Sequence, residues 1–252
     1  MVWKIIQPFY TAFVLAIFLA CLVVVFPFIF LLGIRDKPLT REIIWYIVHY
    51  WSIGWLWVIG MPVKVSGKKP ASGAKYIVVA NHISYMDTIA IYAAIPEYFR
   101  TLAKKEMVKI PLFGFVYKQL AILVDRSSTT GRAKSMRLMW RVLKNESNVT
   151  IFPEGTFNET TAPLKAFYDG AFRLAISTQV PIVPLLFLDT VKRWHYSGWW
   201  KLSPGKNRAI FLDAIPTDGL TMADLPAFKQ KVYEAMETEL LKYKSYNMYH
   251  KS

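Results

Sequence analysis

Several features that define common protein classes are missing from this sequence of 252 residues. Its single cysteine, Cys21, excludes an internal disulfide bond and fits a reducing compartment. The paired Cys and His residues of zinc fingers are absent, as is a basic region followed by heptads, so no nucleic-acid partner is expected. The chain also lacks internal repeats, a Gly-rich phosphate loop and the G-x-S-x-G turn that presents the serine nucleophile of many lipid hydrolases.

Acidic residues are also scarce. The chain has 17 Asp and Glu against 31 Lys and Arg, which gives a formal net charge of +14, and 54% of its residues are hydrophobic. Cationic surfaces are attracted to anionic lipid headgroups. A basic and apolar composition therefore favours a phospholipid bilayer as the partner over nucleic acid.

Residues 8–34 carry no charged side chain. Crossing a bilayer takes about 20 apolar residues, and this run is too long for a secretory signal and has no small-residue cleavage site after it. A second apolar segment, residues 43–61, is rich in Trp and Tyr, which favour the membrane interface. We expect residues 1–62 to form a two-helix membrane anchor and residues 63–252 to form the second domain.

The two apolar segments are separated by the cations Arg35, Lys37 and Arg41. A hairpin that crossed the bilayer would translocate these cations, against the tendency of positive charge to stay inside. We therefore favour an anchor seated in the cytoplasmic leaflet of the inner (cell) membrane, with a spanning hairpin as the alternative. Residues 192–206 mix cations with four Trp and Tyr residues, which indicates a second membrane contact.

From residue 63 onward, short apolar runs alternate with helical patterns, which is typical of an α/β domain. The expected strands are residues 63–65, 76–80, 121–124, 149–152, 181–188 and 209–212. Helices are expected after residue 83 as far as Ala94, at residues 132–145 and 168–178, and from Pro226 onward.

One strand-to-helix junction carries a candidate base. The expected strand at residues 76–80 ends at Asn81 and His82, and Ser84 can cap the next helix with Asp87 three residues later. If His82 precedes the helix and Asp87 lies in its first turn, the carboxylate can reach an imidazole nitrogen. A histidine oriented by an aspartate can remove the proton of a hydroxyl group. Alternatively, His82 is a core or surface residue and Asp87 only caps the helix.

Four motifs follow one another along the chain: Asn81, His82 and Asp87; Lys104-Lys105-Glu106 with Pro111, Gly114 and then Asp125-Arg126; Phe152 to Thr156; and Val180 to Pro184. In this order and spacing they resemble the motifs of the 1-acylglycerol-3-phosphate O-acyltransferase (lysophosphatidic acid acyltransferase) family. The resemblance covers residues 63–215. It implies a central, mostly parallel sheet flanked by helices, the fold of glycerolipid acyltransferases.

The resemblance also implies a reaction. An acyl chain would pass from an acyl thioester to the free 2-hydroxyl of the lysophospholipid 1-acylglycerol 3-phosphate, making phosphatidic acid for phospholipid synthesis. Acyl carrier protein or coenzyme A would carry the thioester as co-substrate. Because a thioester is already activated, we expect no metal, no bound cofactor and no covalent enzyme intermediate.

Particular residues acquire roles through this resemblance. His82 would act as the general base and Asp87 would fix its tautomer. Substrate binding is implied for five further residues: Glu154 and Gly155 towards the acceptor glycerol, Arg126 with Lys105 towards its phosphate, and Thr156 beside them.

The sequence departs from the family at Phe157, where Arg commonly follows Thr156. An aromatic residue there keeps other acceptors open, namely glycerol 3-phosphate, another lysophospholipid or a lyso-aminolipid. A lipid hydrolase and a non-catalytic membrane lipid-binding protein are the remaining alternatives.

Overall fold

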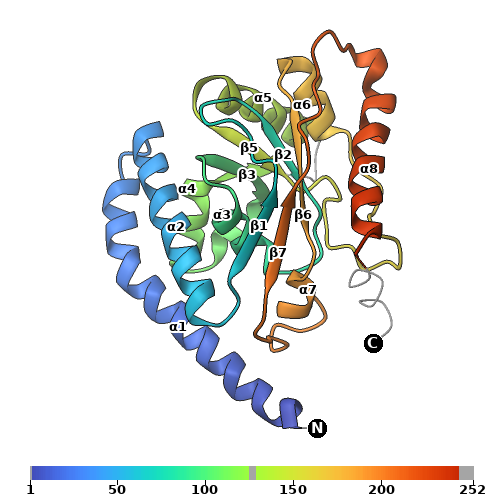
Figure 1. The fold of residues 1–252 in the computed structure, drawn as a ribbon. Helices are drawn as coiled ribbons and strands as arrows, with labels where there is room; N and C mark the ends of the chain where they lie inside the picture. The colour runs from blue at the N-terminus through green and yellow to red at the C-terminus, as the bar shows by residue number, and fades with distance from the viewer. Residues whose placement is uncertain (1, 125–128, 244–252) are drawn as a thin grey trace.

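The structure, a computed structural model, describes residues 2–124 and 129–243 (Figure 1). Within them a seven-stranded sheet has the order β1-β7-β6-β2-β5-β3-β4. Neighbouring strands are parallel except β6 and β7, which are antiparallel. The strands are β1 Val63–Gly67, β2 Ile77–Ala80, β3 Phe99–Lys104, β4 Ala121–Val124, β5 Asn148–Ile151, β6 Ile182–Phe187 and β7 Asn207–Phe211. The mostly parallel α/β sheet that the sequence predicted is confirmed.

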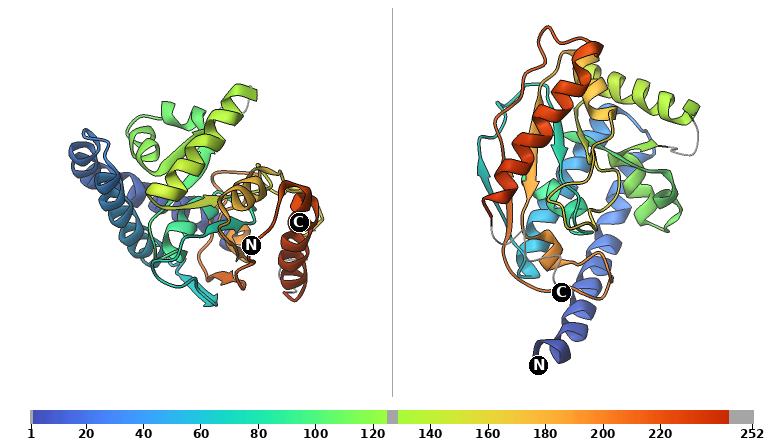
Figure 2. Two further views of the ribbon diagram at one scale, coloured as in Figure 1. Left: turned by 90° about the horizontal axis from the view of Figure 1, so that it is seen from above. Right: turned by 90° about the vertical axis from the view of Figure 1, so that its right-hand side faces the viewer.

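Helices cover both faces of this sheet. They are α1 Val2–Gly33, α2 Pro38–Val58, α3 Asp87–Ala94, α4 Phe113–Leu120, α5 Thr129–Asn145, α6 Gly170–Thr178, α7 Thr190–Arg193 and α8 Leu225–Leu241, with short 3₁₀ helices η1 Lys105–Lys109 and η2 Met222–Asp224. Figure 2 shows α8 on the opposite side of the sheet from α1 and α2. Gly170, expected inside a helix, is instead the first residue of α6.

Two hydrophobic cores result from the alternation of side chains along each strand. Ile77 and Val79 of β2 point into a core shared with α5, α6 and α8. Val78 and Ala80 of the same strand point into a core shared with α1, α2, α3 and α4. Successive residues of a strand face opposite sides, so an entirely apolar strand such as β2 is suited to a position between two helical layers.

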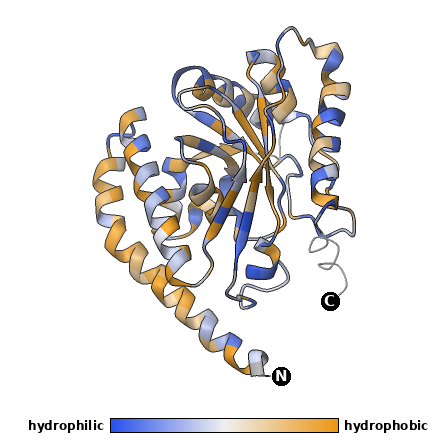
Figure 3. Ribbon diagram, viewed as in Figure 1, coloured by the Kyte–Doolittle hydropathy of each residue, from blue (hydrophilic) through white to orange (hydrophobic). Residues whose placement is uncertain are grey.

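Helix α1 is hydrophobic along nearly its whole length (Figure 3). Its segment Ile5–Gly33 is long and apolar enough to cross a membrane, and only 11% of its most apolar window is buried. Helix α2 differs, because Ile44, Trp45 and Val48 are buried in the core against β2 and α3. The expected boundary at residue 62 is therefore not a break in packing, and a separate two-helix anchor is not confirmed.

The first turn of α2 is held against the α/β domain by a partly buried ion pair. Arg41 donates from Nε and Nη2 to the two carboxylate oxygens of Glu146, at 2.9 and 2.8 Å. The Tyr98 hydroxyl donates to the same carboxylate at 2.6 Å. Burial alone would raise the pKa of Glu146, but the hydrogen bonds from Arg41 and Tyr98 hold it below its usual value. The charged pair thus ties the first two helices to the end of α5.

Candidate active site

The site lies at one edge of the sheet. Strands β2, β5, β3 and β4 run parallel, so their carboxyl ends share an edge. His82 follows β2, Glu154 follows β5 and Lys105 follows β3. This edge is where α/β sheets usually bind ligands. Residues from three of the four sequence motifs lie there.

Asn81 fixes the end of β2. Its side-chain amide donates to the Phe187 carbonyl at 3.0 Å, and its Oδ1 accepts the Phe187 N–H at 2.7 Å. Asn81 is fully buried. The two bonds replace the strand ladder just beyond Ala80, so the chain leaves the sheet at a defined point and presents His82.

His82 and Asp87 are in direct contact. His82 Nδ1 lies 2.9 Å from Asp87 Oδ2, which also accepts the N–H groups of Ile83 and Ser84 at 2.7 and 2.8 Å. Asp87 is fully buried at the first position of α3. A carboxylate facing Nδ1 favours the tautomer with its proton there, which leaves Nε2 as the acceptor. Ser84 was expected to cap the helix, but it closes the preceding turn, accepting the Met86 N–H at 2.9 Å.

Aromatic rings surround the imidazole. Phe152 stacks on His82 with ring centroids 4.2 Å apart, and Phe157 meets it edge-on at 4.4 Å. Tyr85 also packs edge-on against Phe157, with ring centroids 4.8 Å apart. The residue that departs from the family pattern therefore contacts the candidate base directly.

Glu154 binds two backbone N–H groups of the site. Its Oε1 accepts the His82 N–H at 2.8 Å, and its Oε2 accepts the Lys165 N–H at 2.9 Å. Burial raises the pKa of Glu154 to about 7, although both hydrogen bonds oppose that rise. Because each carboxylate oxygen is bound to a backbone N–H, Glu154 positions His82 and Lys165. Its contact with the acceptor, implied by the resemblance, stays a prediction.

The turn after Glu154 wraps around His82. Gly155 has a φ of +73°, a conformation that glycine adopts without strain. The Asn158 N–H donates to the His82 carbonyl at 2.7 Å. Thr156, between Gly155 and Asn158 in the sequence, is exposed. Its Oγ1 accepts a hydrogen bond from Lys165 Nζ at 2.7 Å.

The structure describes one of the two residues predicted to meet the acceptor phosphate. Lys105 is exposed at the start of η1, and Arg126 lies outside the described residues. The structure therefore brings together His82, Asp87, Glu154 and the 155–158 turn.

The sequence analysis missed Lys165, because it lies in a loop without periodic pattern. Among residues 2–124 and 129–243, no cluster of three His, Cys, Asp or Glu side chains is arranged to hold a metal ion.

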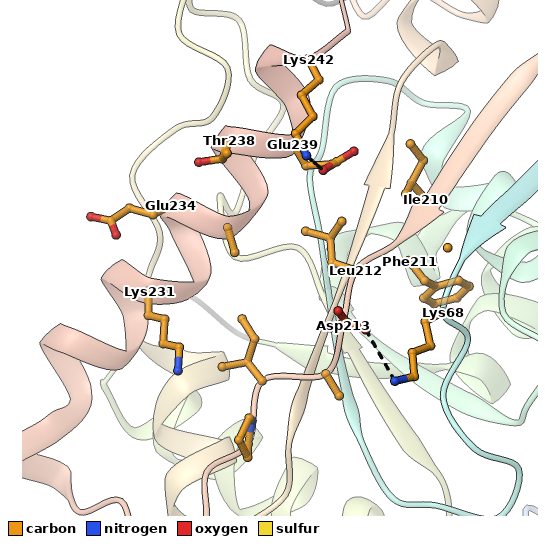
Figure 4. A pocket seen from close by; sticks show the side chains of 15 residues that line it. Lys68, Ile210, Phe211, Leu212, Asp213, Lys231, Glu234, Thr238, Glu239 and Lys242 are labelled. Carbon is orange, nitrogen blue, oxygen red and sulfur yellow. Dashed lines mark hydrogen bonds and ion pairs between the residues drawn. The ribbon is translucent and has the colours of Figure 1, made fainter.

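A cavity of about 860 Å³ lies elsewhere. It is an open groove between α8 and the end of β7 (Figure 4). Ile182 of β6 pairs with Ile215 at the groove, and the same residue pairs with Ile77 at the start of β2. The groove therefore lies at the amino edge of β2, opposite His82. Four of its charged side chains form ion pairs, Lys68 with Asp213 at 3.8 Å and Lys242 with Glu239 at 2.6 Å.

Comparisons with known proteins agree with this geometry. A sequence model of the Acyltransferase family matches residues 62–188. The 1-acyl-sn-glycerol-3-phosphate acyltransferase beta of Homo sapiens is 34% identical over 173 residues, 66% of this chain and 59% of that protein. The 1-acyl-sn-glycerol-3-phosphate acyltransferase of Cocos nucifera is 32% identical over 169 residues, 65% of this chain and 53% of that protein. The chain thus spans less than two thirds of the length of these relatives.

A solved structure shares the fold. The crystal structure of the 1-acyl-sn-glycerophosphate (LPA) acyltransferase from Thermotoga maritima superposes with a TM-score of 0.74, at 22% identity and over 96% of each chain.

Proposed function

This chain belongs to the Acyltransferase family, and from that premise we propose that it transfers an acyl chain from an acyl thioester to the 2-hydroxyl of 1-acylglycerol 3-phosphate, making phosphatidic acid. The observation that carries this proposal is the contact between His82 Nδ1 and the buried Asp87 carboxylate at 2.9 Å. The names of the human and coconut relatives support the choice of acceptor.

The proposed reaction is direct transfer. His82 Nε2 takes the proton of the acceptor hydroxyl as the hydroxyl oxygen attacks the thioester carbonyl carbon. Asp87 stabilises the imidazolium that forms. When the tetrahedral intermediate collapses, the C–S bond breaks and the thiolate accepts the proton from His82. Because the thioester supplies the activation, we propose that no metal, bound cofactor or covalent enzyme intermediate takes part.

Exposed apolar side chains gather on α1 and α2. Helix α2 exposes a row of apolar side chains at helical spacing: Leu39, Ile43, Tyr46, Tyr50, Ile53 and Trp57. The 192–206 loop is fastened to α1, since Gln7 donates to the Leu202 carbonyl at 3.1 Å and Thr11 to the Trp200 carbonyl at 2.8 Å. We propose that these apolar surfaces of α1, α2 and the loop rest on the bilayer.

Two contacts support the proposed depth and orientation of the protein on the bilayer. Trp194 of the loop packs against Tyr85, three residues from His82, with ring centroids 5.4 Å apart. The active site therefore opens beside the headgroups, where a lysophospholipid resides. A spanning hairpin would pull Arg41 away from Glu146, so we propose that both helices stay in the cytoplasmic leaflet of the cell membrane.

The acceptor is tested by direct competition. Purified protein in lipid nanodiscs would receive acyl-coenzyme A or acyl-acyl carrier protein with 1-acylglycerol 3-phosphate, glycerol 3-phosphate, a choline lysophospholipid or a lyso-aminolipid. We expect the highest kcat/KM with 1-acylglycerol 3-phosphate. Turnover of a different acceptor alone would contradict this choice, and fatty acid release without any acceptor would indicate a hydrolase.

A further inference from the structure

One lysine reaches the turn that surrounds the candidate base. Lys165 lies in the loop between β5 and α6. Its backbone N–H is bound by Glu154 Oε2 at 2.9 Å, while Glu154 Oε1 holds the His82 N–H at 2.8 Å. Because one buried carboxylate fixes both main chains, the position of Lys165 relative to His82 is well defined.

The ammonium group of Lys165 is held by neutral oxygens. Nζ donates to Thr156 Oγ1 at 2.7 Å and lies 3.5 Å from the Phe157 carbonyl oxygen. Within the described part of the chain, no carboxylate forms a salt bridge with it, whereas Lys229 pairs with Asp169 at 2.7 Å. An ammonium has three N–H donors, so these two contacts leave capacity for a further acceptor at the half-buried Lys165.

The neighbouring side chain cannot supply positive charge. Phe157 follows Thr156, and its ring packs against His82 at 4.4 Å. The Lys165 ammonium nevertheless lies 3.5 Å from the Phe157 carbonyl oxygen, so a cation contacts the backbone of the residue whose ring touches the base. In 1-acylglycerol 3-phosphate the reacting hydroxyl and the phosphate ester are on adjacent carbons. An acceptor whose hydroxyl meets His82 would therefore bring its phosphate close to this turn.

We propose that Lys165, together with the Thr156 hydroxyl, binds the phosphate of the acceptor, an inference that rests on the proposed function. A lysine acts there as a point charge that follows the phosphate oxygens, with Thr156 as a neutral hydrogen-bonding partner. This role makes Lys165 a specificity-determining residue, because an acceptor without phosphate gains nothing from it.

The test compares Lys165→Met with Lys165→Arg and with Lys231→Met, a control on the exposed surface of α8. Each variant keeps the backbone N–H that Glu154 binds. We expect Lys165→Met to raise KM for 1-acylglycerol 3-phosphate by about 10-fold to 100-fold, the effect of losing one charged hydrogen bond. The KM for the thioester and for 1-acylglycerol without phosphate should stay unchanged. Lys165→Arg should recover most of the loss, and Lys231→Met should match the wild type.

Two outcomes would overturn this role. A KM for the phosphate acceptor within twofold of the wild type in Lys165→Met would do so. An equal loss with the acceptor that lacks phosphate would do so too, because it would indicate a disturbed His82. If Lys165→Met does not fold, Lys165→Gln provides the same comparison. Absence of any wild-type turnover with 1-acylglycerol 3-phosphate would instead refute the proposed function itself.

Discussion

At the scale of single residues, the position of His82 depends on two buried carboxylates with different tasks. Asp87 binds the imidazole, and Glu154 binds the backbone N–H. Both are almost inaccessible to solvent, and Asp87 lies at the amino end of α3, where it accepts two backbone N–H groups. Glu154 follows β5 and also accepts two backbone N–H groups, but they lower its pKa by less than burial raises it. Burial therefore dominates its ionisation and raises its pKa to about 7.

The raised pKa makes the stability of the site depend on pH. The pKa of Glu154 is about 7 in the folded chain against an ordinary value of 4.5. Its contribution to the free energy of unfolding is complete below pH 4.5 and is lost as pH rises through about 7. We expect this free energy to fall by about 3 kcal/mol across that interval because of Glu154. In Glu154→Gln, which stays neutral, that part of the slope should vanish.

Denaturant unfolding at a series of pH values from 4.5 to 8 measures this difference. Glu234→Gln, a change on the exposed surface of α8, is the control and should keep the wild-type slope. If Glu154→Gln and the wild type lose stability in parallel over this range, burial does not raise the pKa of Glu154.

Local sequence could predict the contact of His82 with Asp87, because a strand end and the first turn of the next helix bring positions five residues apart together. The contacts of His82 with Phe157, and of Glu154 with Lys165, depend on how the loops after β2 and β5 meet. Those loops have no periodic pattern, so neither the enclosing aromatic rings nor Lys165 could be predicted.

At the scale of elements, strongly apolar segments were predicted well and half-exposed ones were not. β2 and β6 are buried along their whole length, and their uninterrupted apolar runs identified them. β3, Phe99–Lys104, was missed because its outer half is only partly buried and polar residues interrupt it. Helix α2 was recognised as apolar, but sequence could not show that one side of it packs against the sheet.

Replacing either of two glycines by alanine tests the packing of these elements, and we expect the two changes to shift the free energy of unfolding in opposite directions. A Cβ on Gly114 would lie 2.0 Å from the Val108 carbonyl oxygen, where η1 meets α4. Gly54 in α2 has no atom within 4 Å of an added Cβ. We expect Gly114→Ala to lower the free energy of unfolding by about 1–3 kcal/mol through overpacking. Gly54→Ala should raise it by about 0.5–1 kcal/mol, since alanine loses less conformational freedom in a helix.

Thermal unfolding of the two variants in the same detergent provides the comparison. The expected result is a lower Tm for Gly114→Ala and a slightly higher one for Gly54→Ala. Shifts of the same sign would mean that the approach of η1 to α4 is looser than the structure shows.

At the scale of the whole molecule, the polar and apolar surfaces are segregated. Helices α1 and α2 present apolar side chains to the outside on one side of the sheet, while α8 covers the other side (Figures 2 and 3). With a net charge of +14, the chain is also attracted to anionic headgroups. Composition predicted a membrane partner, and the structure shows which elements carry the apolar surface.

Substitutions of exposed apolar residues should weaken membrane binding and leave the hydrophobic core unchanged. Phe9 and Trp57 are 75% and 73% exposed, on α1 and α2. We expect the double variant Phe9→Glu with Trp57→Glu to bind anionic lipid vesicles at least about tenfold more weakly, because each change removes apolar area from the bilayer. Leu241→Glu, a control at a 53% exposed position on α8, should bind as the wild type does.

Vesicle sedimentation at fixed ionic strength measures the effect. Equal weakening by Leu241→Glu would indicate that net charge alone governs binding. Unchanged binding of the double variant would show that α1 and α2 do not face the bilayer.

The most direct measurement is acyl transfer by the wild type and by His82→Ala, with acyl thioester and 1-acylglycerol 3-phosphate as substrates. His195→Ala is the control, since the exposed Nδ1 of this histidine contacts Ser197 Oγ at 2.7 Å, away from Asp87. Loss of the general base should lower kcat by about 10²- to 10⁴-fold, while His195→Ala keeps wild-type activity. A folded His82→Ala that forms phosphatidic acid at the wild-type rate would contradict the role of His82 and Asp87 as the base and its orienting partner.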